Sequence, residues 1–366
     1  MSGCGRHPQV ADEDCTTTAP EEHFDQTAAG LALSAGARPV ARRLRDTARE
    51  LGVRILERTL GCGGIVAYHG VREESRLGST HITPGALRSQ LEFLAGSYHV
   101  LPLAEYVARR RSGRSLRRCA AVTFDDAYSG VLTLGLPILD RLRLPATVFV
   151  ATSFCRHAKR FWWDRFEWVV QRLEAPARID LLRSVGLEDG AADDEVRDRI
   201  LIQFRGALPR RLDAALRRAE ARVGVVPERA MTGEELIQLA RSDLVDFGCH
   251  SAHHYALPWL DAAKVEKEIR LDLGWLRERV PRVRPYLAYP YGLYTRATVE
   301  AARRGGMEAA FSIEGHAATS RFPLFHCSRV GMADVNTMST LRLRLSWITI
   351  PIVAARNRTW IAERAP

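Results

Sequence analysis

The sequence predicts an α/β fold in which about seven or eight strand–helix units close into a barrel. Short apolar runs, such as residues 119–124, alternate with longer stretches whose apolar residues recur at helical spacing, such as residues 261–280. Strands that alternate with helices pair in parallel through right-handed crossovers. Several of the apolar runs are followed directly by a polar residue, as with Asp125 and His250. Because the active sites of such barrels lie at the carboxyl ends of the strands, we expect these polar residues to meet at one mouth.

Length and charge limit the classes of protein that fit. With 366 residues and 46% hydrophobic content, the chain can form one large core or two ordinary ones, and the strand–helix alternation favours one large domain with appendages. The net charge of +10 indicates contact with an anionic partner such as nucleic acid, phospholipid or a sugar phosphate. Arginine is spread over many predicted helices, and neither zinc-finger spacing nor an aromatic–basic RNA-binding pattern occurs. We therefore do not expect nucleic acid as the partner.

Cysteine usage and the lack of targeting signals predict a cytoplasmic protein. The seven cysteines are scattered and include no Cys-x-x-Cys pair, which favours a reducing compartment over a disulfide framework. Residues 1–26 contain no apolar core of a secretory signal. No run of about 18 uncharged apolar residues occurs, so we predict no transmembrane helix. A peripheral position at the inner face of the membrane stays open.

The two ends of the chain differ in composition from its middle. Residues 1–37 are polar with few large apolar side chains, and we expect them to be disordered. Residues 38–61 predict a basic amphipathic helix with arginines on its polar side. Residues 336–366 form a tail in which arginines surround an apolar run. Each basic segment either packs on the barrel or rests on a membrane surface, and both interpretations stay open.

Residues 62–335 carry the predicted barrel, which a helical insertion interrupts at about residues 160–226. Thr83-Pro84 has the composition of a helix start, and Thr232 and Glu235 have the spacing of a capping box. The predicted strands are residues 65–70, 98–101, 119–124, 146–150, 244–248, 286–289, 309–313 and 325–330. The main helices expected between them are residues 103–111, 232–240, 261–280 and 297–304.

The insertion begins with the aromatic segment Phe161-Trp162-Trp163-Asp164 and continues as charged helices. Its aromatic side chains either pack within the protein or form a wall on which a sugar ring stacks. The sequence leaves both interpretations open.

Two adjacent carboxylates, Asp125 and Asp126, end the apolar run of residues 119–124. Consecutive side chains of a strand point to opposite faces, so the two cannot do the same job. One can turn toward a metal ion while the other stays free as a base. A helix cap or an Asx-turn after the strand is the simpler interpretation of this dipeptide alone.

His250 and His254 favour the metal interpretation. On a helical turn, or a loop of that pitch, residues at this spacing face one point. Two imidazoles and one carboxylate form a ligand set that leaves positions for water and substrate, as catalytic zinc sites require. The same ligand types suit non-haem iron oxygenases, but those usually take His and the carboxylate from one short motif, which is not the spacing here.

Three motifs occur in order along the chain: Thr123-Phe124-Asp125-Asp126, His250-Ser251-Ala252-His253-His254-Tyr255-Ala256-Leu257 and Tyr289-Pro290-Tyr291-Gly292. They resemble the first three motifs of the polysaccharide deacetylase family, the NodB homology domain of carbohydrate esterase family 4. Tyr68-His69 and residues 161–164 are similar to long bacterial members that belong to surface-polysaccharide pathways. The resemblance implies a distorted (β/α) barrel of about seven parallel strands, a divalent metal ion, and removal of N- or O-acetyl groups from sugars.

The resemblance also implies a role for each motif residue. Asp126, His250 and His254 would bind the metal ion, usually Zn²⁺ in this family, with Co²⁺ or Mn²⁺ as alternatives. Asp125 would be the general base, and the backbone N–H of Tyr291 would help to hold the oxyanion.

The general acid and the substrate pocket are assigned in the same way. Leu324-Phe325-His326 matches the Leu-x-His motif that supplies the general acid of the family, and His69 and His316 compete with His326 for this role. His69, Tyr289 and Trp163 are the candidate pocket residues.

The chain departs from the family pattern near the base and the acid. In the family, an Arg that orients the base stands two residues before the Pro of the third motif, and here that position is Ala288. Arg284 and Arg329 are the candidate replacements. The later Asp–Trp motif of the family is absent from the sequence.

Three functions are compatible with these observations. The first is a metal-dependent hydrolase that removes an N-acetyl group from an amino sugar of a polysaccharide or glycan precursor, with a lipid- or nucleotide-linked sugar as one expected substrate form. The second is a deformylase or O-deacetylase on the same fold. The third is a non-catalytic glycan- or membrane-binding homologue, which the missing Arg suggests and the intact Asp125, Asp126, His250 and His254 oppose.

Overall fold

The computed structural model describes residues 63–74, 80–184, 210–314, 323–334, 336 and 338–345. All of them lie in one compact unit, Gly52–Pro366. The predicted N-terminal segments, residues 1–37 and 38–61, lie outside the described residues, and so does most of the predicted tail.

The described strands form one sheet of parallel strands that nearly closes into a barrel, as the sequence predicts. The strands follow the order β8-β7-β6-β5-β4-β3-β1-β9, and β2 pairs with β3 off this path. The sheet has nine strands rather than about seven, because three of them contain only two residues each. Their bounds are β1 Gly64–Tyr68, β2 His99–Val100, β3 Cys119–Phe124, β4 Ala146–Val150, β5 Val245–Cys249, β6 Val283–Ala288, β7 Ala309–Ser312, β8 Cys327–Ser328 and β9 Val330–Gly331.

Closure of the barrel depends on a change of partner at Arg329. β8 pairs with β7 at one edge of the sheet, whereas β9 pairs with β1 at the other edge. The N–H of Arg329 still donates to the Ser312 carbonyl, and three residues later Met332 donates to Ala67. The prediction of a single strand over residues 325–330 is therefore wrong, because this segment leaves one edge of the sheet and joins the opposite one.

Side chains of β3 alternate between two apolar layers. Ala120, Val122 and Phe124 belong to the large core between the sheet and the outer helices. Cys119 and Ala121 belong to a smaller cluster with residues from β1, β4, β6, β7 and β8, and helix α3 (Leu103–Arg111) contributes to it. By the same alternation, the inner row continues through Thr123 to Asp125. The strand thus directs Asp125 to the inner layer.

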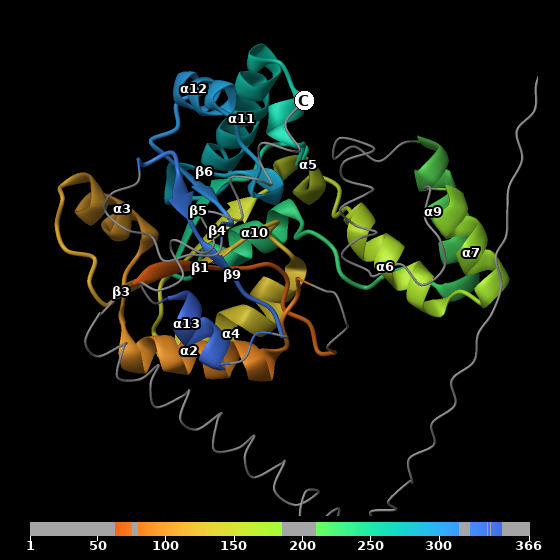
Figure 1. Ribbon diagram of the computed structural model, residues 1–366, viewed down its shortest axis with the longest axis horizontal. Helices are drawn as coiled ribbons and strands as arrows, with labels where there is room; N and C mark the ends of the chain where they lie inside the picture. Colours follow the sequence, from red (N-terminus) through yellow and green to blue (C-terminus); the bar gives the residue numbers. More distant parts are fainter. Residues whose placement is uncertain are drawn as a thin grey trace, which may run out of the picture. The chain divides into compact units, whose positions relative to one another are not determined.

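Helices surround the sheet, and their ends follow the capping signals of the sequence. Thr83 caps α2 with Pro at the first turn, and Thr232 and Glu235 form the predicted capping box of α10. Figure 1 shows α11 beside α12 on one side of the strands, and α2, α4 and α13 together on another. The helices are α2 Pro84–Ser97, α3 Leu103–Arg111, η1 Val131–Gly135, α4 Leu136–Leu142, α5 Thr152–Cys155, α10 Gly233–Leu239, η2 Leu257–Trp259, α11 Ala262–Arg277, η3 Pro290–Gly292, α12 Arg296–Arg304 and α13 Met338–Arg344.

Among the described residues of the predicted insertion, the helices are α6 Trp162–Arg172, α7 Ala175–Ser184 and α9 Arg210–Val223. They share an apolar cluster of their own, which includes Phe166, Val169 and Leu216. Arg165 joins α6 to α9 through ion pairs with Glu220 and Asp213. The insertion is therefore a helical group with its own small core.

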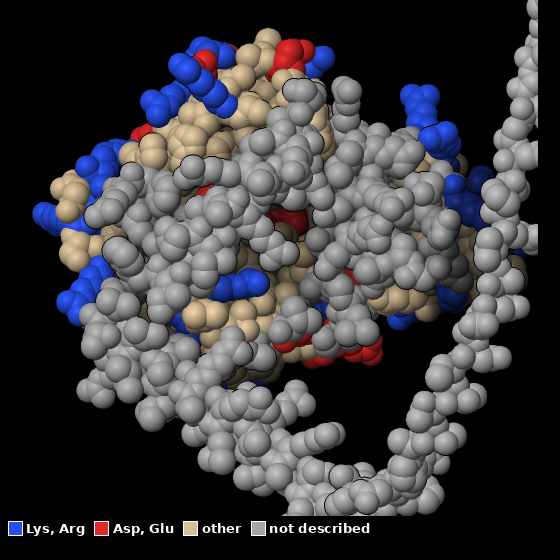
Figure 2. Space-filling view, viewed as in Figure 1, with Lys and Arg blue, Asp and Glu red and all other residues tan. Residues whose placement is uncertain are grey.

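The described part of the tail packs on the barrel, since Leu341 and Leu345 are fully buried in the large core. Arg342 lies over the ring of Phe93 in α2. None of the described helices has the length and apolar character needed to cross a membrane. On the face that Figure 2 shows, Lys and Arg side chains are scattered over the regions of α3, α12 and α9.

Candidate active site

The turn after β3 separates the two adjacent carboxylates. Asp126 and Ala127 both have left-handed backbone angles, with φ of 69° and 54°. Each left-handed residue other than glycine costs roughly 1–2 kcal/mol, so such a turn persists only where its surroundings hold it. The carbonyl of Ala127 accepts a hydrogen bond from the N–H of Met231. The N–H of Ser129 donates to the carbonyl of Arg229. The turn thus gives the two adjacent carboxylates different surroundings.

Asp125 forms a buried, two-pronged ion pair with Arg329. Both nitrogens of the guanidinium fork lie 2.7 Å from the two carboxylate oxygens of Asp125. Arg329 also donates to Thr123 and lies over the ring of Phe149, and its side chain is fully buried. Burial would raise the pKa of Asp125, but the charge and hydrogen bonds of Arg329, with His250 nearby, hold it below its usual value. Asp125 is therefore ionised at neutral pH.

Asp126, His250 and His254 converge, and all three side chains are buried. Oδ1 of Asp126 lies 3.5 Å from Nε2 of His250 and 3.2 Å from Nε2 of His254. One ligand atom from each residue lies within 4.8 Å of the others. The three metal ligands expected from the sequence thus face one point.

The protonation states at this point fit a cation. Nδ1 of His250 lies 2.8 Å from the Ala288 carbonyl, which can only accept, so Nδ1 carries the proton and Nε2 presents a lone pair to Asp126. Burial, with His254 nearby, lowers the pKa of His250 to about 4 despite the charge of Asp125. Burial would raise the pKa of Asp126, but His254 and His250 lower it below its usual range. An ionised carboxylate therefore faces a neutral imidazole lone pair, an arrangement that a divalent cation between them would stabilise.

The His250–His254 segment is a loop, not a helical turn, and carboxylates of α11 hold it. Asp272 accepts the N–H of His250 at 2.8 Å, and Glu268 accepts from Ser251 and from the N–H of His253. Burial raises the pKa of Asp272 to about 7, against the hydrogen bonds that it accepts. These bonds fix the backbone that presents both imidazoles.

Three other predicted residues lie at the same place. His69 follows β1 and is partly buried; burial lowers its pKa, while the charges of Asp125 and Asp126 oppose this shift. Tyr291 has a left-handed φ of 59° after β6, and its ring centroid lies 4.6 Å from that of His254. Trp163 from α6 lies 4.9 Å from the same imidazole. The insertion thus supplies an aromatic side chain to the candidate site.

Two predicted residues are not brought to this cluster. Tyr289 is fully buried in the core, where its hydroxyl donates to the Phe325 carbonyl at 3.1 Å. His326 precedes β8 instead of following a strand, and its ring packs against Tyr294 at 5.0 Å. Burial lowers its pKa, with Glu314 and Arg303 as charged neighbours. His316, the other competitor for the acid role, lies outside the described residues.

The sequence left open which arginine compensates for Ala288, and the geometry distinguishes the two candidates. Arg284 pairs with Asp246 at 2.9 Å, and its side chain is about half exposed. The side chain of Arg329 is fully buried. Only Arg329, of these two, contacts Asp125. The signal in the sequence was indirect: the resemblance implies an Arg beside the expected base, and Ala288 stands at that position.

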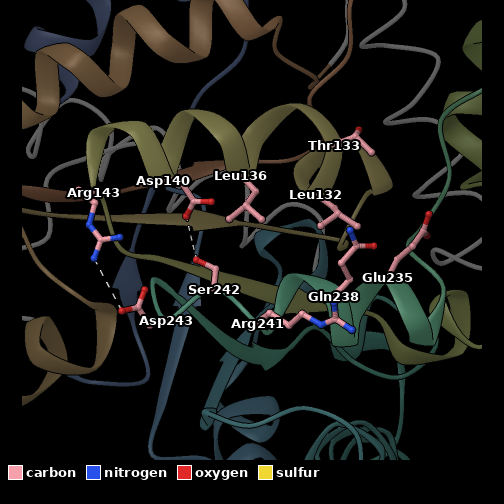
Figure 3. Close-up of a pocket in the computed structure, with 10 residues that line it drawn as sticks. All are labelled: Leu132, Thr133, Leu136, Asp140, Arg143, Glu235, Gln238, Arg241, Ser242 and Asp243. Carbon is pink, nitrogen blue, oxygen red and sulfur yellow. Dashed lines mark hydrogen bonds and ion pairs between the residues drawn. The ribbon is translucent and has the colours of Figure 1, made fainter.

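A groove of about 660 Å³ lies elsewhere, on the outer side of the barrel (Figure 3). Leu132 and Leu136 line one side of it, and Gln238 and Arg241 line the other. Its rim is joined by a hydrogen bond of 3.1 Å between Ser242 and Asp140. It contains none of the converging His and Asp ligands, so it is separate from the candidate site.

Comparison with known proteins gives one matching family model and a set of solved structures with a similar fold. The polysaccharide deacetylase family model matches residues 212–310, a range that includes His250, His254 and Tyr291 but not Asp125 or Asp126. No curated protein sequence matches the chain.

Solved structures with a similar fold include the Streptococcus pyogenes deacetylase PplD in complex with acetate. It is 16% identical, with a TM-score of 0.51 over 78% of this chain and 97% of that one. A polysaccharide deacetylase from Bacillus cereus is 14% identical, with a TM-score of 0.51 over 78% of this chain and 69% of that one. At these identities the similarity concerns the fold. The family match covers residues 212–310, and over these residues the chain is similar to the polysaccharide deacetylase family.

Proposed function

We propose that this chain is a metal-dependent hydrolase that removes an N-acetyl group from an amino sugar of a polysaccharide or glycan precursor. The observation that carries the proposal is the buried convergence of Asp126, His250 and His254 directly beside the Asp125–Arg329 pair. Buried ionisable groups at the mouth of a barrel, with one carboxylate paired and the next facing imidazoles, are typical of hydrolytic centres.

Asp126, His250 and His254 would hold one divalent ion, and their mixed nitrogen and oxygen donors suit Zn²⁺, with Co²⁺ or Mn²⁺ as alternatives. Such an ion supplies a water of lowered pKa and polarises the acetyl carbonyl. The hydrogen bond from His250 to the Ala288 carbonyl keeps the ligating nitrogen of that ring free of its proton.

Asp125 accepts the proton of the attacking water. Each carboxylate oxygen has two lone pairs, so the bond to Arg329 leaves one on each oxygen for the water. Arg329 fixes the orientation of the carboxylate and keeps it ionised, which is the role that the resemblance gives to the Arg missing at Ala288.

The backbone N–H of Tyr291 is the proposed oxyanion donor, supported by the position of this residue at the end of β6 and beside His254. For protonation of the leaving nitrogen we assign His69 in place of His326. The charges of Asp125 and Asp126 act on His69, whereas the described contacts of His326 are with Tyr294, Glu314 and Arg303.

The proposed substrate is an N-acetylated sugar or oligosaccharide, and lipid- or nucleotide-linked forms belong in the screen. The experiment measures acetate and formate release from N-acetyl and N-formyl amino sugars, free and linked, by the Zn²⁺-reconstituted protein. We expect acetate release that a chelator abolishes and that Asp125→Asn eliminates. Acetate release that persists in Asp125→Asn would refute the base assignment, and formate release alone would redirect the proposal to a deformylase.

A further inference from the structure

Asp164 is a buried carboxylate that the proposed reaction does not use. Its side chain is 3% exposed, and it lies in α6 of the insertion. Oδ1 accepts a hydrogen bond from Nε2 of His81 at 2.8 Å, and Oδ2 accepts from the hydroxyl of Tyr128 at 2.6 Å. The indole N–H of Trp163 donates to the same hydroxyl at 3.0 Å. We call these four residues the Asp164 network.

One end of the network reaches the turn that carries a candidate metal ligand. Tyr128 follows the left-handed pair Asp126-Ala127, whose strained backbone persists only where its neighbours hold it. The backbone on either side of Tyr128 is held by pairing with residues 229–231. The bond to Asp164 is the side-chain anchor of this turn, and it is short and charge-assisted.

The other end of the Asp164 network is the Trp163 ring, which lies beside the candidate site. The Trp163 ring lies 4.9 Å from His254 and 5.9 Å from Tyr291, and Phe161 stacks behind it at 4.8 Å. Because the indole N–H is bonded to Tyr128, the orientation of this ring depends on the same hydroxyl as the metal-ligand turn.

The surrounding fold makes room for this arrangement. The ring of Tyr128 meets His81 edge-on at 4.6 Å. A Cβ at Gly70 would lie 2.1 Å from the His81 ring, so only glycine leaves space for that imidazole beside the end of β1.

We propose that Asp164 is a positioning residue of the metal centre. Through the hydroxyl of Tyr128, it fixes the Asp126–Ala127 turn and the Trp163 ring relative to each other. The helical insertion is thereby coupled to the candidate metal site. The inference rests on the proposed function only in taking a metal ion as the ligand of that site. If the network merely fastened α6 to the barrel, its loss would lower stability without changing the affinity of the folded protein for metal.

The test compares Tyr128→Phe and the isosteric Asp164→Asn with Glu220→Gln. Glu220 is a buried carboxylate of the same insertion that pairs with Arg165 and contacts no site residue among those described. The Kd for Zn²⁺ is measured on the folded, metal-free proteins by competition with a chromophoric chelator. We expect about tenfold or greater weakening in both network variants, as loss of groups that orient metal ligands typically causes, and an unchanged Kd in Glu220→Gln.

A wild-type Kd in the folded network variants would overturn the proposal. So would failure of both network variants to fold while Glu220→Gln folds, since that result assigns the network a structural role. Absence of zinc binding in the wild type would instead contradict the proposed function.

Hydrogen exchange of the metal-free proteins then tests the positioning role without metal. We expect faster exchange at the amides of residues 127–131 in Tyr128→Phe, and wild-type exchange there in Glu220→Gln. Unchanged exchange in Tyr128→Phe would also overturn the proposal.

Discussion

Two ionic clusters of this protein, a partly buried one in the insertion and a fully buried one at the barrel mouth, differ in how completely they are paired. In the insertion, Arg165 donates to both oxygens of Glu220 at 2.8 Å and to Asp213 at 2.7 Å. At the barrel mouth, Asp125 is paired in the same two-pronged manner with Arg329, but the adjacent Asp126 faces two imidazoles from a strained turn.

The difference is the one expected between a structural cluster and the proposed metal centre. Arg217 also pairs with Asp213, so the insertion cluster balances two arginines against two carboxylates. Such a matched set satisfies its own charges. A buried carboxylate that faces a neutral imidazole lone pair carries an electrostatic cost that a cation removes. Strained backbone at the same place indicates that the surrounding structure maintains this poised arrangement.

The largest expected effect is that of Arg329→Met, which breaks the paired half of the mouth cluster. Removing one partner of a buried ion pair leaves an uncompensated charge, so we expect about 3–5 kcal/mol lower stability in urea unfolding at pH 7. Arg284→Met, at the half-exposed arginine that pairs with Asp246, should cost less than about 1 kcal/mol. A double variant with Asp125→Asn should recover part of the loss, and an equal loss in Arg329→Met and Arg284→Met would contradict the comparison.

The next effect concerns the assignment of the acid. His69→Ala should lower kcat about 100-fold, because a positioned general acid typically contributes at least that much. His326→Ala should leave kcat within about threefold, since its described contacts lie away from the ligand cluster. Steady-state kinetics on the substrate found in the screen decides, and the reverse ranking would return the acid role to His326.

Glu220→Gln tests the fully paired cluster. Loss of its charge-assisted bonds to Arg165 should cost about 2 kcal/mol of stability. Urea unfolding measures this loss, and we expect an unchanged kcat and unchanged zinc content. A loss of bound zinc in this variant would mean that the two clusters are not independent.

The smallest effect belongs to a third carboxylate, Glu235, which lies partly exposed in the capping box of α10. Hydrogen bonds from Arg229, against a smaller effect of burial, lower its pKa below the ordinary value of 4.5. The contribution of Glu235 to the free energy of unfolding is therefore present above pH 4.5. It is lost as the pH falls through the lowered pKa of the folded state. Glu235→Gln should cost about 1 kcal/mol at pH 7. The cost should be much smaller at pH 3, and an equal cost at both pH values would contradict this sign.

Local signals predicted most of the fold. The buried strand at residues 119–124 and the helix at residues 103–111 have the predicted bounds, because apolar runs and a preceding Pro mark them clearly. The prediction of one strand over residues 325–330 was wrong. The chain changes from one sheet edge to the other at Arg329, and this change depends on closure of the whole barrel.

In the candidate site, too, local features were predictable from the sequence and long-range pairings were not. Strand ends and the short spacing of His250 and His254 predicted that both imidazoles lie near the carboxylate pair, and the family resemblance selected Asp126 as the third ligand. The pairing of Arg329 with Asp125 and that of Asp164 with Tyr128 link residues far apart in the chain, and no local pattern encodes them. Leu324-Phe325-His326 fits a motif by its letters, yet it precedes a strand, so its position differs from that of the strand-end ligands.

The most direct measurement is zinc content by mass spectrometry after reconstitution, on the wild type, His250→Ala and His253→Ala. His253 is the matched control, because its ring bonds to Glu268 and lies outside the ligand set. We predict about one zinc per chain in the wild type and in His253→Ala, and none in His250→Ala. Equal zinc in His250→Ala and the wild type, or no zinc in any of the three, would contradict the metal centre.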